Sequence, residues 1–315
     1  MKNALKSKQF IFSCVATVGA GILGIWASVS AQPQTQQAPP SLTKAQSPAE
    51  LKLQGNREPY LPSSLNQSEK PNAKKRAILG SDDRIPMTSK DYPWSAVGKI
   101  EGIGDDGRGY SCTGTLIAED LVLTNAHCVV NPETGKLSKA IAFEPNLING
   151  IVPDKNDVAY ATAVHPGTYF KKGTFDDFVD DWAILKLNKS IGKKYGYLGW
   201  KSLPSSTLVG DTQKFALVGY SGDFPNPKKK GYEDLTAGES NTAGVHLGCS
   251  ILRHKNNFLY HNCDTNHGAS GGAIIANLDG KYYIVALHSG SNKVNGLVLN
   301  RAVEMSRIDE WLQQN

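Results

Sequence analysis

The sequence predicts an all-β domain of two packed antiparallel barrels that ends in one C-terminal α-helix. From about residue 92 onward, short apolar runs rich in β-branched residues alternate with Gly, Asp, Asn and Pro, a pattern typical of many short antiparallel strands. Only the last stretch, about 301–314, has helical spacing of its apolar residues. The length of the chain suits a first barrel at about 92–195 and a second at about 200–300. The runs that we expect to form strands are Trp94–Ile100, Gly114–Ile117, Leu121–Thr124, Trp182–Leu187, Phe215–Gly219, Ala273–Ile275 and Tyr282–Leu287.

The first 31 residues have the features of an export signal. Lys2, Lys6 and Lys8 precede a long uncharged run that ends in Val29-Ser30-Ala31, the small-x-small pattern that a signal peptidase needs. We therefore expect 1–31 to be removed, the protein to be secreted or periplasmic, and no stable membrane association. The alternative is an uncleaved anchor, because the uncharged run is long enough to span a bilayer.

We interpret residues 32–76 as a disordered propeptide. This stretch is rich in Gln, Pro, Ser, Asn and Lys and has few large apolar residues, so it cannot bury enough surface to fold alone. It ends in Lys74-Lys75-Arg76, a basic cluster that processing proteases favour, and a processing protease acting at Arg76 is an expected partner. The alternative is a plain linker that holds the domain off a membrane.

The charge of the chain is unevenly distributed. The formal net charge is +5, but residues 1–76 hold 10 Lys or Arg and 3 Asp or Glu, which leaves 24 basic and 26 acidic residues in 77–315. The basic excess thus lies in the part that we expect to be lost. A nucleic acid or an anionic membrane is therefore not an expected partner.

Four cysteines remain once the export signal is removed, namely Cys112, Cys128, Cys249 and Cys263. An even number in an exported chain predicts two disulfides, and three pairings are open. The pairing of sequence neighbours is Cys112–Cys128 with Cys249–Cys263. A rival interpretation is a zinc site made by Cys249, His254, His261 and Cys263, but their spacing matches no familiar zinc pattern. We expect no metal and no other cofactor.

Acyl transfer by a serine needs a base beside the hydroxyl, a carboxylate that orients the base, and backbone donors for the developing oxyanion. The segment Leu123-Thr-Asn-Ala-His127-Cys128 places a histidine at the end of an apolar strand, with Cys112 sixteen residues upstream. A histidine held in this way can serve as the general base. The alternative is a structural histidine next to a cysteine.

The carboxylate is expected from Asp181. Asp180 and Asp181 come directly before the apolar run Trp182–Leu187, and an acid at the start of a strand can be buried there and accept the histidine Nδ1–H. Asp181 opens the run, so we prefer it to Asp180. The alternative is that both acids cap a solvated loop.

The nucleophile is expected at Ser270, within Asp264-Thr-Asn-His-Gly268-Ala-Ser270-Gly-Gly272. Glycines on both sides of a serine allow a sharp turn that presents its hydroxyl. They also free the N–H groups of Gly268 and Ser270 to form an oxyanion hole. The three segments together, in the order His, Asp, Ser, carry more weight than any one of them.

These motifs resemble the trypsin-like serine proteases, and within them the bacterial glutamyl endopeptidases, the V8-like group. The resemblance covers about 77–315: it begins at Ala77-Ile-Leu-Gly-Ser-Asp-Asp-Arg84 and ends with Ile284–Gly290, Asn295–Asn300 and the final helix. It implies a chymotrypsin-like double antiparallel β-barrel with the triad in the cleft between the barrels. It also implies that the second barrel determines specificity.

The resemblance further implies how processing acts. In the V8-like group the α-amino group that processing creates helps form the specificity pocket. In this chain that group would be the amine of Ala77. Animal trypsins instead pair their new N-terminus with an aspartate beside the nucleophile. Ala269 occupies that place in this chain and cannot form the ion pair, so activation by that route is excluded.

Substrate preference depends on the second barrel. His288 and Thr265 match the V8-like positions that contact an acidic substrate side chain, and Ser289 and Gly290 follow His288 in the same segment. A histidine, a hydroxyl and an α-ammonium group would stabilise a buried carboxylate, which favours cleavage after Glu or Asp. Asp264, six residues before Ser270, lies where trypsins place the acid that binds Lys or Arg, so cleavage after Lys or Arg is the alternative.

We therefore expect a secreted serine endopeptidase, made as a zymogen, that acts on protein or peptide substrates. The alternative from a different class is a catalytically inactive homologue that binds peptides or a partner surface, since a fold alone does not define activity. The intact set of His127, Asp181 and Ser270 argues against it, because a binding module needs none of them.

Overall fold

The computed structural model describes residues 39–45, 47–51, 53, 58–68, 82–171, 174–294 and 297–314. They lie in one compact unit, Pro39–Asn315. The expected signal peptide at 1–31, the basic cluster ending at Arg76, and Ala77 fall outside the described residues. Within the described chain, no helix combines the length and the apolar character that crossing a bilayer requires.

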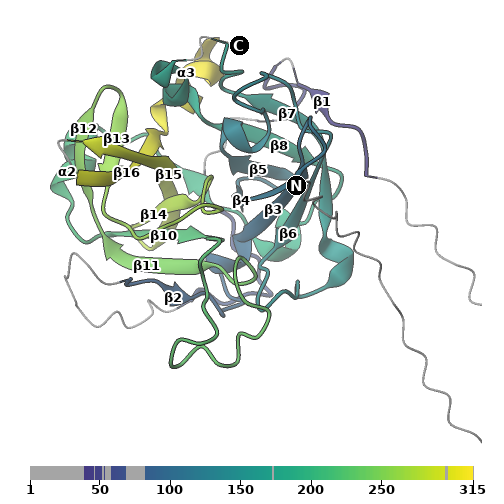
Figure 1. The fold of residues 1–315 in the computed structure, drawn as a ribbon, viewed down its shortest axis with the longest axis vertical. Coiled ribbons are helices and arrows are strands. Elements are labelled where there is room, and N and C mark those ends of the chain that lie inside the picture. Colours follow the sequence, from purple (N-terminus) through teal and green to yellow (C-terminus); the bar gives the residue numbers. More distant parts are fainter. Residues whose placement is uncertain are drawn as a thin grey trace, which may run out of the picture. The chain divides into compact units, whose positions relative to one another are not determined.

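The first sheet follows the order β1-β7-β6-β3-β4-β5-β8, and a further pairing of β7 with β8 closes it into a barrel (Figure 1). All its pairings are antiparallel except that of β1 with β7. Its strands are β1 Thr43–Lys44, β3 Val97–Ile103, β4 Gly109–Leu116, β5 Leu121–Thr124, β6 Ala140–Pro145, β7 Ala159–Pro166 and β8 Ala183–Leu187.

The second sheet follows the order β12-β13-β16-β15-β14-β10-β11-β2, with β9 paired to β15. Only Ser250 separates β11, near one end of this path, from β12 at the other end, so the sheet curls into a second barrel. Its strands are β2 Ile85–Pro86, β9 Gly199–Trp200, β10 Phe215–Gly219, β11 Gly244–Cys249, β12 Ile251–Lys255, β13 Phe258–His261, β14 Ala273–Leu278, β15 Lys281–Val294 and β16 Leu297–Glu304. The predicted fold class, a double antiparallel β-barrel with a C-terminal helix, is confirmed.

Short helices connect the strands, and the last one closes the chain. Helix α3 begins at Ser306 and not at about residue 301, because Arg301–Glu304 pair with β15 as the end of β16. The helices are η1 Trp94–Ala96, η2 Ala126–Cys128, η3 Lys155–Asp157, η4 Phe175–Asp180, α1 Gly192–Tyr195, α2 Ser205–Gly210 and α3 Ser306–Gln314.

The alternating pattern of each strand determines which side chains enter the barrel. Along β6, Ile141 and Phe143 are buried while Ala140, Ala142 and Glu144 are partly exposed, as the two-residue period of a strand requires. Buried residues of this kind from the first barrel form one continuous apolar cluster. This packing fixes the strand ends from which the loops of the site emerge.

The register between β5 and β8 places two of the predicted site residues at the same end of the first barrel. Thr124, the last residue of β5, is the antiparallel partner of Ala183, the first residue of β8. His127 lies three residues beyond Thr124, and Asp181 lies two residues before Ala183. The two side chains therefore start from neighbouring backbone.

Part of the segment expected to be disordered is ordered. We call the described residues between 39 and 68 the strap. It contributes β1 to the first sheet, beside β7 (Figure 1), and Leu51 is fully buried in the main apolar cluster, which contains the core of that barrel. The prediction of disorder for 32–76 is thus wrong for these residues. Composition indicates whether a segment can fold alone, whereas the strap buries its few apolar residues against the barrel.

Candidate active site

His127 and Asp181 form a hydrogen-bonded pair. Asp181 is fully buried, its Oδ2 lies 2.8 Å from His127 Nδ1, and its Oδ1 accepts the His127 backbone N–H at 2.9 Å. A carboxylate can only accept hydrogen bonds, so the ring proton lies on Nδ1 and Nε2 is left as an acceptor. The His127 side chain keeps 22% of its surface exposed, so this Nε2 can act as a general base on a bound substrate.

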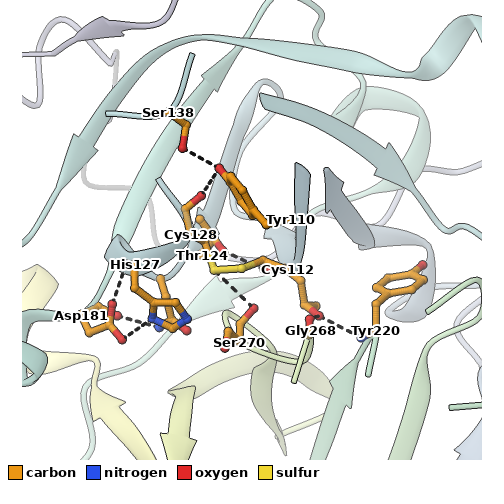
Figure 2. Close-up of a disulfide and its surroundings, with 12 residues drawn as sticks. Tyr110, Cys112, Thr124, His127, Cys128, Ser138, Asp181, Tyr220, Gly268 and Ser270 are labelled. Carbon is orange, nitrogen blue, oxygen red and sulfur yellow. Dashed lines mark hydrogen bonds and ion pairs between the residues drawn. A yellow bond between two sulfur atoms is a disulfide. The ribbon is translucent and has the colours of Figure 1, made fainter. Parts of the chain in front are cut away.

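The backbone around this pair is anchored on both sides (Figure 2). Asn125 is fully buried and its Nδ2 donates to the Asp181 carbonyl at 2.6 Å. Cys128, directly after His127, is joined by a disulfide to Cys112 on β4. Cys249 and Cys263 form the second disulfide, so of the three open pairings the structure has that of sequence neighbours. The second disulfide removes the two thiolates that the zinc interpretation required.

Ser270 lies in a turn that only glycine permits on either side. Gly268 has φ +92° and Gly271 has φ +80°, both in the left-handed region. A Cβ at Gly268 would lie 2.4 Å from the Tyr220 carbonyl oxygen, and a Cβ at Gly271 would lie 2.3 Å from that of Thr113. The turn can therefore pack against both barrels only with glycine at these two positions.

The first barrel holds this turn directly. The Ser270 carbonyl accepts the Thr113 N–H at 2.8 Å, and Cys128 Sγ lies 3.9 Å from the same oxygen. Since Cys128 follows His127, this contact brings Ser270 to the histidine. No hydrogen bond joins the Ser270 hydroxyl to His127, both of which the structure describes; in substrate-free sites such bonds often form only when substrate binds.

Some backbone N–H groups of the serine turn are hydrogen-bonded within the protein and others are not. The N–H groups of Ala269, Gly271 and Gly272 donate to the carbonyls of Asn266, His288 and Ala269. Those of Gly268 and Ser270 donate to no acceptor among the described residues. Nearly all backbone donors in proteins are paired with protein or water. The unpaired N–H groups of Gly268 and Ser270 are therefore available to bind an anionic oxygen.

A chain of side-chain hydrogen bonds lies beside the serine turn. His261 Nε2 lies 3.1 Å from His288 Nδ1, and His288 Nε2 lies 3.3 Å from Thr265 Oγ1. His261 is fully buried and His288 nearly so, and burial lowers the pKa of His261 to about 3. Burial, and then the neighbouring His261, also lower the pKa of His288 well below its usual range. Both rings are therefore neutral at pH 7.

The backbone fixes which nitrogens carry protons in this chain. His261 Nδ1 accepts the Cys263 N–H at 3.2 Å, so the single proton of neutral His261 lies on Nε2 and is donated to His288 Nδ1. The single proton of His288 then lies on Nε2. It points to Thr265, so the chain ends in a neutral N–H donor.

The comparison with protein families identifies the chain. The family model named Trypsin matches residues 83–312. The chain belongs to the trypsin family. This match spans both barrels and all three of His127, Asp181 and Ser270.

Curated relatives of this trypsin-family chain include a mammalian and a bacterial protease. Serine protease 23 of Bos taurus is 29% identical over 234 residues, which are 68% of this chain and 55% of the relative. Glutamyl endopeptidase of Bacillus licheniformis is 30% identical over 150 residues, 47% of this chain and 43% of the relative. The chain thus spans about half the length of the curated relatives that it matches.

Among solved structures, a Glu endopeptidase in complex with MPD has the same fold. It shares 24% sequence identity with a TM-score of 0.59, over 75% of this chain and 98% of that one. A protease named Anisep from Arthrobacter nicotinovorans has a TM-score of 0.51 at 17% identity, over 70% of this chain and 97% of that one. At these sequence identities, both structural similarities show the fold alone.

Ser289 and Gly290, two further predicted substrate-binding residues of the trypsin-family domain, lie on β15. Ser289 is buried and its Oγ accepts from Arg301 Nε at 3.2 Å, and the guanidinium of Arg301 lies beside Gly290. The Arg301 group also lies 4.5 Å from the ring centroid of Phe178. Its pKa is lowered by burial. A buried cation therefore lies behind the segment that follows His288.

Asp264 is directed away from the histidine chain. Its Oδ2 accepts the Asp83 N–H at 2.7 Å and lies 3.2 Å from His246 Nδ1, which accepts the Asp264 N–H at 2.8 Å. The carboxylate therefore accepts from the N-terminal segment, while the Asp264 backbone donates to His246 of β11. Ala77, the other predicted member of the pocket, lies outside the described residues.

Two residues of the site were not predicted from the sequence. Thr113 connects the barrels, because its Oγ1 donates to the Gly268 carbonyl at 3.0 Å and accepts the Tyr220 N–H at 2.9 Å. His261 orients His288. The pattern Cys-Thr-Gly before His127 contains Thr113, but only the register of β4 shows that it faces the serine turn. His261 precedes Cys263 by two residues and had no visible partner in the sequence.

Proposed function

We propose that the chain is a serine endopeptidase in which Ser270, His127 and Asp181 are the catalytic residues. The observation that carries this proposal is the buried Asp181–His127 pair beside a turn whose Gly268 and Ser270 amides are free. A catalytically inactive binding module has no need for this combination of an oriented base and unpaired donors.

The proposed reaction begins when the Ser270 hydroxyl attacks the peptide carbonyl and His127 Nε2 takes its proton. The oxyanion of the tetrahedral intermediate binds the Gly268 and Ser270 N–H groups. His127 then protonates the leaving amine, which departs and leaves an acyl group on Ser270. Water, deprotonated by the same Nε2, hydrolyses this ester, while Asp181 holds the ring and stabilises its cationic form.

Covalent labelling tests the nucleophile. With an arylsulfonyl fluoride we expect one adduct, on Ser270, because His127 activates that hydroxyl. Peptide mapping by mass spectrometry locates the label. The His127→Ala variant should label at least a hundredfold more slowly; equal labelling of both proteins, or a label on another serine, would contradict the proposed roles.

We further propose that the enzyme prefers Glu, or Asp, at the residue before the cleaved bond. The His288 Nε2–H and the Thr265 hydroxyl can donate to a carboxylate, and the Arg301 guanidinium lies behind Ser289 and Gly290. A substrate carboxylate also makes protonation of His288 more favourable, because an opposite charge stabilises the charged ring. Asp264 weakens the Lys or Arg alternative, since its carboxylate already accepts the Asp83 backbone N–H.

A matched peptide series tests this preference. Peptides that differ only in Glu, Gln or Lys before the cleaved bond should give kcat/KM values at least tenfold higher for Glu than for Gln. His288→Phe removes the donor and should abolish this difference. His254 pairs with Glu304 at 2.7 Å on the second barrel, so His254→Phe serves as the control and should preserve it. A preference for Lys would assign specificity to Asp264 instead.

We also propose that the protein is exported and made as a zymogen that is cut after Arg76. The signal-like residues 1–31, the basic cluster and the two disulfides support this. An enzyme that prefers Glu would not cut after Arg, so a separate protease is the expected activator. Incubation of the Ser270→Ala precursor with active enzyme tests this; trimming at Arg76 by that enzyme would disprove the need for a separate activator.

A further inference from the structure

The strap joins the first barrel as a strand. Its Ala45 N–H donates to the Val164 carbonyl at 2.8 Å, and Thr43 Oγ1 donates to the Thr162 carbonyl at 2.8 Å. His165 Nδ1 lies 3.1 Å from the Ala45 carbonyl, and the ring of His165 stacks on that of Trp311 at 4.1 Å. The part of β7 beyond its pairing with β6 is therefore paired with the chain's own N-terminal part.

The few apolar side chains of the strap are placed inside the domain. Leu51 is fully buried, Ala45 is 2% exposed and Leu53 is 9% exposed, and all three belong to the main apolar cluster, which contains the core of the first barrel and part of the second. Loss of the strap would open this cluster to water. Leu61, by contrast, is 38% exposed.

The strap also contacts the connection between the two barrels. Tyr60 and Tyr197 exchange two backbone hydrogen bonds, at 2.9 and 3.1 Å, and their rings stack with centroids 5.2 Å apart. The backbone approaches so closely that a Cβ at Gly196 would lie 2.9 Å from the Tyr60 carbonyl oxygen.

The last part of the strap reaches the second barrel. Gln67 Nε2 donates to the Gly280 carbonyl at 2.9 Å, and the Glu58 carboxylate accepts from Lys281 Nζ and from the Tyr283 hydroxyl, each at 2.8 Å. The strap is thus hydrogen-bonded to the first barrel, to the connection between the barrels and to the second barrel. The residues it contacts are not those of the catalytic site, so its position is compatible with an open cleft.

We propose that the strap is a permanent second chain and not a discarded leader: after cleavage at Arg76 it remains bound to the domain without a covalent link. This rests on the proposed processing, in which hydrolysis adds one water across the Arg76–Ala77 bond. Ser68 is the last described residue of the strap and Asp82 is the first described residue after it, so a cut at Arg76 breaks none of the contacts above. All four cysteines of the described chain are paired within the domain, so no disulfide retains the strap.

A cleavable full chain tests this proposal. The sequence Lys74-Lys75-Arg76 is replaced by the recognition site of a site-specific protease in the Ser270→Ala protein, the folded protein is cut, and size-exclusion chromatography with mass spectrometry follows both fragments. We expect the strap fragment to elute with the domain in a 1:1 ratio and to separate only in denaturant. Separate elution of a strap fragment from a folded domain would overturn the proposal.

A matched pair of variants identifies what holds the strap. Leu51→Asp should speed release of the cut fragment at least tenfold, whereas Leu61→Asp should leave it unchanged. Equal release from both would show that the buried anchor does not retain the strap. Because the protein carries Ser270→Ala and is cut by an added protease, retention is measured independently of peptidase activity and of its natural activator.

Discussion

Replacement of Asp181 by Asn isolates the role of this carboxylate in preparing the base. In the structure Asp181 accepts two hydrogen bonds from His127, at 2.9 Å from the backbone N–H and at 2.8 Å from Nδ1. An asparagine can keep the first through its oxygen, but its NH₂ then faces Nδ1. That nitrogen must become an acceptor, and the ring proton moves to Nε2, where the serine proton has to be received.

The variant should therefore fold and bind substrate, yet react slowly. The wrong tautomer lowers kcat by about 10⁴-fold in triads of this kind, which corresponds to about 5 kcal/mol of transition-state stabilisation. KM should change little, because Asp181 is fully buried and does not contact the pocket. The assay is hydrolysis of a chromogenic peptide, with a thermal melt to confirm the fold.

The neighbouring acid provides the control. Asp180 pairs with Arg307 Nε at 2.8 Å and its side chain is 37% exposed, so Asp180→Asn should change kcat less than about twofold, as exposed ion pairs contribute little. A loss of less than tenfold in Asp181→Asn, with the fold intact, would refute the assignment of Asp181. An equal loss in both variants would refute the reasoning from tautomers.

Three further predictions concern the structure around the site. Thr113→Val removes one hydrogen-bond donor and one acceptor between the barrels, so it should lower the unfolding free energy measured in urea by about 1–3 kcal/mol and should also lower kcat. Thr113→Ser keeps the hydroxyl and should restore the stability and the kcat. No change in Thr113→Val would contradict the linking role of Thr113. Gly271 and Gly280 have nearly the same φ, +80° and +81°, but only a Cβ at Gly271 would lie 2.3 Å from a backbone atom. Gly271→Ala should therefore lower the unfolding free energy by at least about 2 kcal/mol more than Gly280→Ala in the same assay. Equal losses of stability would argue against the tight turn. The pKa values of His261 and His288 are lowered on folding, so as the pH falls below about 6.5 the unfolded state takes up protons first. The unfolding free energy should then fall by up to about 1.4 kcal/mol per pH unit for each ring between roughly pH 6 and 4. His261→Gln should flatten this slope; an unchanged slope would show that His261 is not buried as a neutral ring.

The sequence was sufficient for the parts of the fold that depend on local pattern. The apolar runs that became β5, β8 and β10 could be located because nearly all of their residues are buried, which makes each run continuously apolar. The motifs around His127, Asp181 and Ser270 could be found because glycine, cysteine and strand ends accompany them. The structure adds what these motifs could not contain, namely that the register of Thr124 with Ala183 brings the first two together.

The features that were missed depend on contacts between distant segments. Leu51 lies in a polar stretch, and nothing in its neighbourhood predicts that it enters the main apolar cluster of the domain. The apolar residues that follow Arg301 have the spacing of a helix, yet Arg301 belongs to β16, because pairing with β15 outweighs the local preference for a helix. His261 acquires a role only through His288, which is 27 residues away on another strand.

A digest of a mixed peptide library most directly tests the central claim, that Ser270 makes this chain a peptidase. The full chain, before and after cleavage at Arg76, and its Ser270→Ala counterpart are incubated with the library, and mass spectrometry identifies the cleaved bonds. We predict cleavage after Glu by the processed protein and none by the variant. The same cleavages by the Ser270→Ala protein, or no cleavage by any folded form, would contradict the account.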